Sequence, residues 1–285
     1  MTPLEALRCL QAVDVQVIDL QVMECLADTP VSVTWRVELT GRQAVLRVDR
    51  PLAARLGLQR AAEPAVLRAV AARDLGPRLL AADPERGLLL TEWLEGATWK
   101  PGGGRGGLRQ VARLLRAVHA VPVRAPVLDL PVLDLAAVIG RYAGLAGPAG
   151  AALAQEARAR LAACLDRPGL PPAFCHNDPS PPNILDTASA TVSGTFSMPH
   201  PIRDNDLRLI DWEYAGINRP EFDLAVFTAE AGLAPPAGAE LLEAYLERPP
   251  EPAESRCHAA WLAFYRSLSL LWQQAVVAPG RGPAT

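Results

Sequence analysis

The apolar residues of this chain change their spacing at a glycine-rich segment, and this change constrains the fold more than any other feature. Before residues 101–107, apolar and polar residues alternate, most clearly over 31–39, which is typical of antiparallel strands. After this segment, Leu108, Val111, Leu114, Leu115 and Val118 follow the helical period. The sequence therefore predicts an α+β chain with a small antiparallel-sheet lobe followed by a mainly helical lobe.

The same patterns place the individual elements. Pro64 is compatible with a helix over 59–73 only in its first turn, because proline lacks an N–H and fixes φ. The strands are expected at 13–22, 31–39, 44–48, 79–82, 87–93 and 207–210, and the helices at 4–12, 59–73, 108–119, 134–146, 150–166, 221–232, 237–248 and 254–277.

The domain organisation follows from these elements. We expect an N-terminal nucleotide-binding lobe at 1–96, a C-terminal helical lobe at 97–278 that carries the catalytic and acceptor sites, and a disordered tail at 279–285. The Ser/Thr/Pro-rich interval 186–206 has no clear periodicity and is expected to be an exposed insertion.

Composition excludes several classes of protein. The chain has 285 residues, 50% of them hydrophobic, which is enough for a large core. A net charge of −3 without a basic stripe argues against nucleic-acid binding. Five scattered cysteines without a Cys-x-x-Cys spacing predict neither a disulfide framework nor a zinc site. We find no signal-peptide pattern and no long apolar run, so we expect a cytoplasmic protein without membrane contact, whose oligomeric state stays open.

Two acidic motifs suggest the chemistry. His176-x-Asp178 is followed five positions later by Asn183, and an apolar run leads into Asp211. Phosphoryl transfer needs a carboxylate beside the acceptor hydroxyl and oxygen ligands for Mg²⁺. The pattern His-x-Asp-x-x-x-x-Asn, followed by Ile-Asp-Trp-Glu-Tyr-Ala-Gly, resembles the aminoglycoside phosphotransferase and choline kinase superfamily. Residues 210–225 look most like its choline/ethanolamine and thiamine kinase branch.

This resemblance implies a bilobal protein-kinase-like fold with ATP and Mg²⁺ in the cleft. It makes Asp178 the catalytic carboxylate and Asn183 and Asp211 the metal ligands, with His176 in a structural role. The plain alternatives are that Asp178 caps a turn before Pro179, and that Asp211 is an ordinary exposed residue at a strand end.

The resemblance also assigns the nucleotide contacts. Lys100 is the only lysine and lies too far along the chain to occupy the third strand, so Arg47 is expected to bind phosphate oxygens there, positioned by Glu63. Related kinases often carry glycine in the phosphate loop, whereas here Thr29 and Ser32 are expected to bind phosphate oxygens through their hydroxyl and backbone N–H groups. Alternatively, Arg47 is an ordinary surface residue on an edge strand, and Glu63 interacts with a helix dipole.

Acceptor recognition is expected from the second lobe. Glu213, Asp223, Trp261 and Tyr265 are the candidate substrate contacts, although aromatic residues at this spacing are more often a core face. Asp223 matches a family position that often supports the active site by hydrogen bonds. We expect phosphorylation of a small cationic alcohol of the choline, ethanolamine or thiamine type. The alternatives are an aminoglycoside-type antibiotic phosphotransferase and an inactive kinase-like binding protein.

Overall fold

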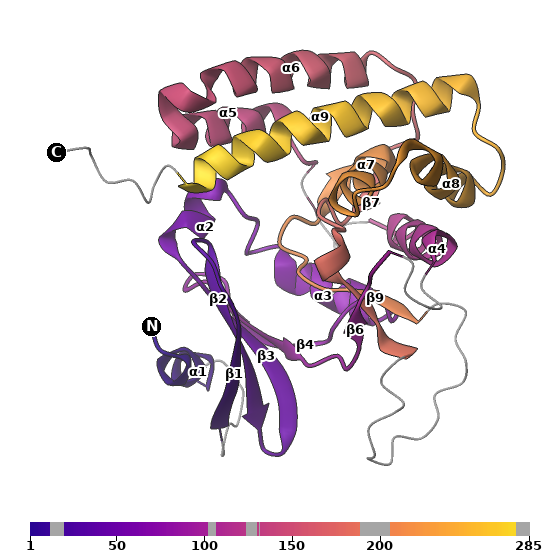
Figure 1. The fold of residues 1–285 in the computed structure, drawn as a ribbon. Coiled ribbons are helices and arrows are strands. Elements are labelled where there is room, and N and C mark those ends of the chain that lie inside the picture. Colours follow the sequence, from indigo (N-terminus) through magenta and orange to yellow (C-terminus); the bar gives the residue numbers. More distant parts are fainter. Residues whose placement is uncertain (12–19, 102–106, 124–129, 131, 189–205, 278–285) are drawn as a thin grey trace.

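The first lobe of the protein is built on a twisted antiparallel sheet. The computed structural model describes residues 1–11, 20–101, 107–123, 130, 132–188 and 206–277. The sheet has the strand order β1-β2-β3-β5-β4 (Figure 1). Its strands are β1 (Leu20–Asp28), β2 (Ser32–Leu39), β3 (Arg42–Asp49), β4 (Leu79–Asp83) and β5 (Leu88–Glu92).

Alternation along the strands gives the sheet two apolar faces. Helix α1 (Pro3–Gln11) packs Leu7 against Leu46 and Leu90 on one face. Leu89 points to the other face, where it joins the cluster that contains the buried side of α3 (Glu63–Ala71). Neighbouring residues of a strand point to opposite faces, so β5 can contribute to both clusters.

A short helix, α2 (Pro51–Leu56), leads from β3 toward the helical lobe. It begins with a proline at its first position, which suits the first turn, and ends at Gly57, whose φ of 75° is the left-handed conformation that glycine tolerates. Leu52, Ala53 and Leu56 are buried in the core of the second lobe rather than against the sheet. Helix α2 therefore joins the two lobes.

The second lobe is mainly helical. Its long C-terminal helix α9 crosses α5 and α6, while α4, α7 and α8 lie to one side of it (Figure 1). Ile139, Ala157, Trp261, Phe264 and Leu271 are all fully buried in the core that α5, α6, α7 and α9 share. The helices are α4 (Leu108–His119), α5 (Leu135–Ala146), α6 (Ala151–Leu165), α7 (Pro220–Glu230), α8 (Pro235–Leu246) and α9 (Pro252–Val277).

Short strands between the lobes hold the segments with the two acidic motifs. A three-stranded sheet contains β6 (Ala97–Thr98), β8 (Ile184–Asp186) and β9 (Leu207–Leu209). A two-stranded sheet pairs β7 (Ala173–Cys175) with β10 (Gly216–Asn218). One-turn 3₁₀ helices occur at Gly147–Gly150 and Pro181–Asn183.

The structure confirms the predicted α+β fold with a sheet lobe and a helical lobe. The residues of β1 lie mostly beyond the strand predicted at 13–22, which falls largely outside the described residues, and α2 was not predicted. Most of the predicted insertion at 186–206 and the tail at 279–285 also lie outside the described residues, and the lobe boundary at residue 96 stays a prediction.

No helix among the described residues combines the length and the apolar character that crossing a membrane requires.

Candidate active site

The loop between β7 and the 3₁₀ helix at Pro181–Asn183 carries Asp178. Asn177, next to it, has a φ of 65°, which is uncommon for any residue except glycine. Its side chain fixes this conformation, because Nδ2 donates to the carbonyl of Tyr214 at 2.9 Å and Oδ1 accepts from Asn218 at 2.9 Å. Strained backbone persists only where the surroundings determine it, as they do here.

Asp223 stabilises the same loop by hydrogen bonds to its backbone. This residue is fully buried on α7, and its carboxylate accepts from the backbone amides of His176 at 2.9 Å and Asn177 at 2.8 Å. Nε2 of His119 lies 3.1 Å from the same carboxylate. The expectation that Asp223 contacts the acceptor is wrong, because its oxygens face the loop backbone. The supporting role by hydrogen bonds is what its geometry permits.

His176 is a structural residue of this loop, as the sequence predicted. Burial lowers the pKa of its ring to about 4, so the imidazole is neutral near pH 7. Nε2 donates to the carbonyl of Ile210 at 3.0 Å, and Nδ1 accepts from the amide of Asp178 at 3.2 Å. The ring therefore ties the loop to the strand end that carries Asp211.

Asp178 faces the cleft with one oxygen held in place. Nδ2 of Asn183 donates to its Oδ2 and to its backbone carbonyl, both at 3.0 Å. Burial raises the pKa of Asp178 well above its usual value, and the nearby charges of Asp211 and Glu213 raise it further. Its affinity for a proton is thus greater than that of an ordinary exposed carboxylate.

Asn183 and Asp211 are brought together by strand pairing. Ile184 and Leu209 are partners in the antiparallel pair β8–β9, and the amide of Ile210 donates to the carbonyl of Asn183 at 2.9 Å. Asp211 adopts a φ of 62°, and its side chain is 42% exposed to the cleft. Oδ1 of Asn183 accepts no hydrogen bond from the described residues. The two side chains offer the kind of oxygens that hard cations prefer.

Arg47 is buried at the centre of an ion-pair network. It forms a two-pronged pair with Glu63, with Nη1 3.0 Å from Oε1, and also contacts Asp211 at 3.1 Å and Glu213 at 3.6 Å. Burial disfavours its charge, but these carboxylates outweigh that cost and keep the pKa of Arg47 above its usual value. The structure confirms the predicted contact between Arg47 and Glu63 and excludes the alternative of an exposed arginine on an edge strand.

Arg60 is a second cation of this network that sequence reasoning missed. It binds Asp49 with Nη2–Oδ1 at 2.8 Å and also reaches Glu63 at 3.2 Å and Glu213 at 2.9 Å. Burial and the charge of Asp211 raise the pKa of Glu213 to about 7 in spite of both arginines. Arg60 lies at the start of the helix predicted over 59–73, before the observed α3 begins at Glu63, and nothing in its local sequence marks it as a site residue.

The predicted phosphate loop is a tight turn between β1 and β2. The Thr29 hydroxyl accepts from the amides of Val31 at 3.2 Å and Ser32 at 3.0 Å and donates to the carbonyl of Ser32 at 3.0 Å. Arg50 donates to the carbonyl of Thr29 at 2.8 Å. The hydroxyl that was expected to bind phosphate is therefore used by its own turn, which differs from the expectation. No hydrogen bond of the Ser32 hydroxyl is found within the described residues.

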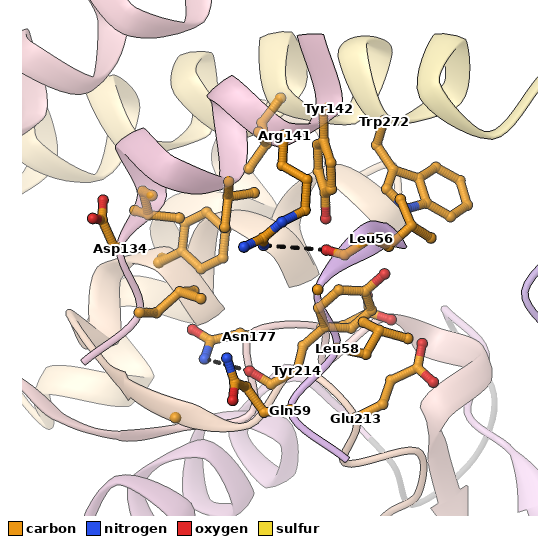
Figure 2. Close-up of a pocket in the computed structure, with 18 of the residues that line it drawn as sticks. Leu56, Leu58, Gln59, Asp134, Arg141, Tyr142, Asn177, Glu213, Tyr214 and Trp272 are labelled. Carbon is orange, nitrogen blue, oxygen red and sulfur yellow. Dashed lines mark hydrogen bonds between the residues drawn. The ribbon is translucent and has the colours of Figure 1, made fainter. Parts of the chain in front are cut away.

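A cavity of about 420 Å³ opens beside Asp178 on the side of the helical lobe. Tyr142 of α5 and Trp272 of α9 line one side of it, and Tyr214 and Glu213 line the opposite side (Figure 2). Two more of its lining residues are paired, since the hydroxyl of Tyr265 donates to Oε1 of Glu230 at 2.7 Å. Aromatic faces and carboxylates thus line one cavity.

Two of the four predicted acceptor contacts line this cavity and two do not. Glu213 and Tyr265 do, whereas the buried Asp223 and Trp261 do not. The expectation for Trp261 is wrong because its ring is fully buried, at 5.9 Å from the ring of Phe222 and 5.8 Å from that of Phe264. Sequence reasoning assigned no site role to the lining residues Tyr142, Tyr214, Glu230 and Trp272. For Trp272 a signal existed, because it follows Tyr265 by seven residues, two helical turns along the same predicted helix.

Comparison with family models gives two matches. The model of the phosphotransferase enzyme family matches residues 30–194, more than half of the chain. The model of choline/ethanolamine kinase matches residues 152–247. Between them these matches include Asp178, Asn183, Asp211 and Asp223.

Individual relatives agree with these models. Protein LicA from Haemophilus influenzae is 39% identical over 71 residues, which are 25% of this chain and 21% of the relative, so the match spans about a fifth of that protein. A choline/ethanolamine kinase family protein from Mesorhizobium loti is 24% identical with a TM-score of 0.70, covering 100% of this chain and 89% of the other. Choline kinase LicA from Streptococcus pneumoniae is 17% identical with a TM-score of 0.73, covering 99% and 93%. The two solved structures share the fold of this chain.

Proposed function

The chain belongs to the phosphotransferase enzyme family, and on that premise we propose that it transfers the γ-phosphoryl group of ATP to the hydroxyl of a small cationic metabolite of the choline, ethanolamine or thiamine type. One observation carries the proposal. Asp178, beside Asn183, opens onto a cavity whose wall combines aromatic rings with carboxylates. The similarity to choline/ethanolamine kinases supports the same class of acceptor.

The cavity wall suits an ammonium group. Tyr142, Tyr214, Tyr265 and Trp272 present aromatic rings, and each good contact of a cation with such a ring contributes about 0.5–2 kcal/mol. Glu230, on the same wall, adds a negative charge that is shared with only one hydroxyl among the described residues. An amino alcohol bound here would place its cationic end among the rings and its hydroxyl toward Asp178.

Asp178 would act on the acceptor hydroxyl. Its carboxylate accepts the hydroxyl proton and orients the oxygen toward the phosphorus, while Asn183 keeps the carboxylate in one rotamer. The raised pKa of Asp178 favours proton uptake as the new P–O bond forms. Orientation contributes most, because the transition state of phosphoryl transfer is loose.

The nucleotide would bind on the other side of Asp178. The carboxylate of Asp211 and the amide oxygen of Asn183, which lie on adjacent strand ends, fit a magnesium ion that keeps several waters. Such an ion, when bound, neutralises charge on the phosphate oxygens. Arg47, which binds Glu63 through both of its η nitrogens, would offer its remaining N–H groups to these oxygens.

Replacement of Arg47 tests the nucleotide site. We expect Arg47→Lys to raise the KM for ATP about ten-fold or more, because a point charge cannot reproduce the planar fork. Arg47→Ala should in addition lose several kcal/mol of stability, since it leaves Glu63 without its main cationic partner. The matched control is Arg42→Ala, at an exposed position of the same strand. An unchanged ATP dependence in a folded Arg47→Lys variant would remove Arg47 from the nucleotide site.

The function itself is tested by measuring ATP consumption with Mg²⁺ across a panel of acceptors. Choline, ethanolamine, thiamine and their close relatives form one arm, and aminoglycosides form the other. We expect acceptor-dependent release of ADP in the first arm. Turnover confined to aminoglycosides would assign the antibiotic alternative, and nucleotide binding without turnover on any acceptor would assign an inactive kinase-like protein.

A further inference from the structure

One side chain in the cavity does not fit a purely cationic acceptor. Arg141 of α5 points into the cavity between Asp134 and Tyr142 (Figure 2), and it is the only cation among the described lining residues. Its one hydrogen bond within the described part of the chain is a long contact of 3.3 Å from Nη1 to the carbonyl of Leu56. The rest of the guanidinium fork has no protein acceptor there.

Three of the four carboxylates that line the cavity have partners other than Arg141. Asp134 accepts the amide of Ala137 at 2.9 Å as the N-cap of α5, and Glu230 accepts the hydroxyl of Tyr265. Glu213 binds Arg60 at 2.9 Å. No ion pair of Arg141 occurs within the described residues, so its positive charge remains available to a ligand.

The backbone leaves room for the guanidinium at this place. A Cβ at Gly57 would lie 2.1 Å from Nη1 of Arg141, so the arginine occupies the space that a side chain would fill. Gly57 ends α2 in the left-handed conformation, where glycine is favoured. The group is thus positioned at the cavity wall by its fit against α2.

We propose that the acceptor is a zwitterion: besides its hydroxyl and its ammonium group it carries a carboxylate, which Arg141 binds. This inference rests on the proposed function, because it names the acceptor of the same site. The planar fork of arginine matches a carboxylate with two parallel hydrogen bonds.

A carboxylate fits this cavity better than a phosphate does. Asp134, Asp178, Glu213 and Glu230 all line the wall, and they would repel a dianion more strongly than a monoanion. The volume of about 420 Å³ lies in the range of sites for drug-sized ligands, which leaves space for a group beyond a bare amino alcohol. Arg47 and Asp211 do not line this cavity, so Arg141 is on the acceptor side of Asp178.

Matched acceptor pairs test the proposal. Each pair differs by one carboxylate: ethanolamine and serine, 3-amino-1-propanol and homoserine, choline and N,N,N-trimethylserine. We expect the wild-type enzyme to favour the carboxylated member of at least one pair by ten-fold or more in kcat/KM. In Arg141→Gln that ratio should fall about 100-fold, mainly through KM, because the carboxylate then loses its charged partner. Arg141→Lys should restore part of the ratio.

The control is Arg55→Gln, which removes an arginine from the exposed side of α2 without touching the cavity, and the ratio should stay as in the wild type. Binding of the same pairs is also measured by calorimetry, which does not require turnover. Arg141-dependent binding of carboxylated molecules without turnover would show that Arg141 binds a carboxylate in this cavity, and it would overturn the proposed kinase function.

Three results would overturn the inference. The first is equal or better use of the uncarboxylated members by an active wild-type enzyme. The second is a ratio that Arg141→Gln leaves unchanged. The third is a rise in the KM for ATP in Arg141→Gln that is the same with both members of a pair, which would place the guanidinium on the nucleotide instead.

Discussion

Asp178→Asn is expected to lower kcat by about a thousand-fold while the protein stays folded and still binds ATP. The substitution keeps the size of the side chain but removes the oxygen that takes the proton of the acceptor hydroxyl, and general-base catalysis contributes about 10²–10⁴-fold. Nδ2 of Asn183 lies 3.0 Å from Oδ2 of Asp178. The same amide can donate to the side-chain oxygen of an asparagine at position 178, so the loop should keep its conformation.

The measurement is steady-state turnover with the best acceptor, together with the Kd for ATP from calorimetry. Asp166→Asn, at an exposed position after α6, is the matched control and should keep wild-type kcat. Retention of most of the rate by Asp178→Asn would show that this carboxylate is not the base. A loss of ATP binding along with turnover would show that it acts through the nucleotide.

Asp223→Ala is expected to lower both stability and activity. The carboxylate satisfies the backbone amides of His176 and Asn177 in a fully buried place, and an unsatisfied buried donor costs about 1–3 kcal/mol. We therefore expect the free energy of unfolding to fall by about 3 kcal/mol or more. Since the loop carries Asp178, kcat should fall by at least about ten-fold in the molecules that remain folded.

Urea unfolding and turnover at a temperature where the variant is folded separate these two effects. Glu240→Gln on the exposed side of α8 serves as the control and should change neither quantity appreciably. Asp223→Asn is the milder variant: it keeps one acceptor oxygen and should lose less stability than Asp223→Ala. If kcat of the folded Asp223→Ala protein equalled that of the wild type, the carboxylate would not position the catalytic loop.

Periodicity predicted the fold best where a single apolar face packs on one core. Helix α4 has the predicted bounds, because Val111, Leu114, Leu115 and Val118 all lie on its buried side. Pro64 falls in the first turn of α3, where proline is tolerated. Most residues of β1 were not predicted as a strand, because the predicted strand ended at Val22: the residues of β1 after Leu20 are all exposed, so no buried face imposes an alternation. Helix α2 is too short to show a period.

The candidate site was predictable where the spacing of residues along the chain places them together. Asp178 and Asn183 are five residues apart in one segment, and the contact of Arg47 with Glu63 was predicted from the family resemblance. The cavity wall was not predictable in this way, because Tyr142, Tyr214 and Trp272 come from separate segments of the chain. Trp261 shows the reverse error: helical spacing cannot tell which side of a helix faces the core and which faces a cavity.

The left-handed backbone at Asn177 and Asp211 limits which amino acids these two positions can accept. Asparagine and aspartate visit this conformation more readily than other non-glycine residues, whereas a β-branched residue is strongly disfavoured. At position 211 the residue that the backbone tolerates is also the one whose oxygens suit a cation. In a screen of all substitutions at these two positions, we therefore expect very few residue types to preserve the fold and the activity. Their number should be smaller than the need for a side-chain oxygen alone would predict.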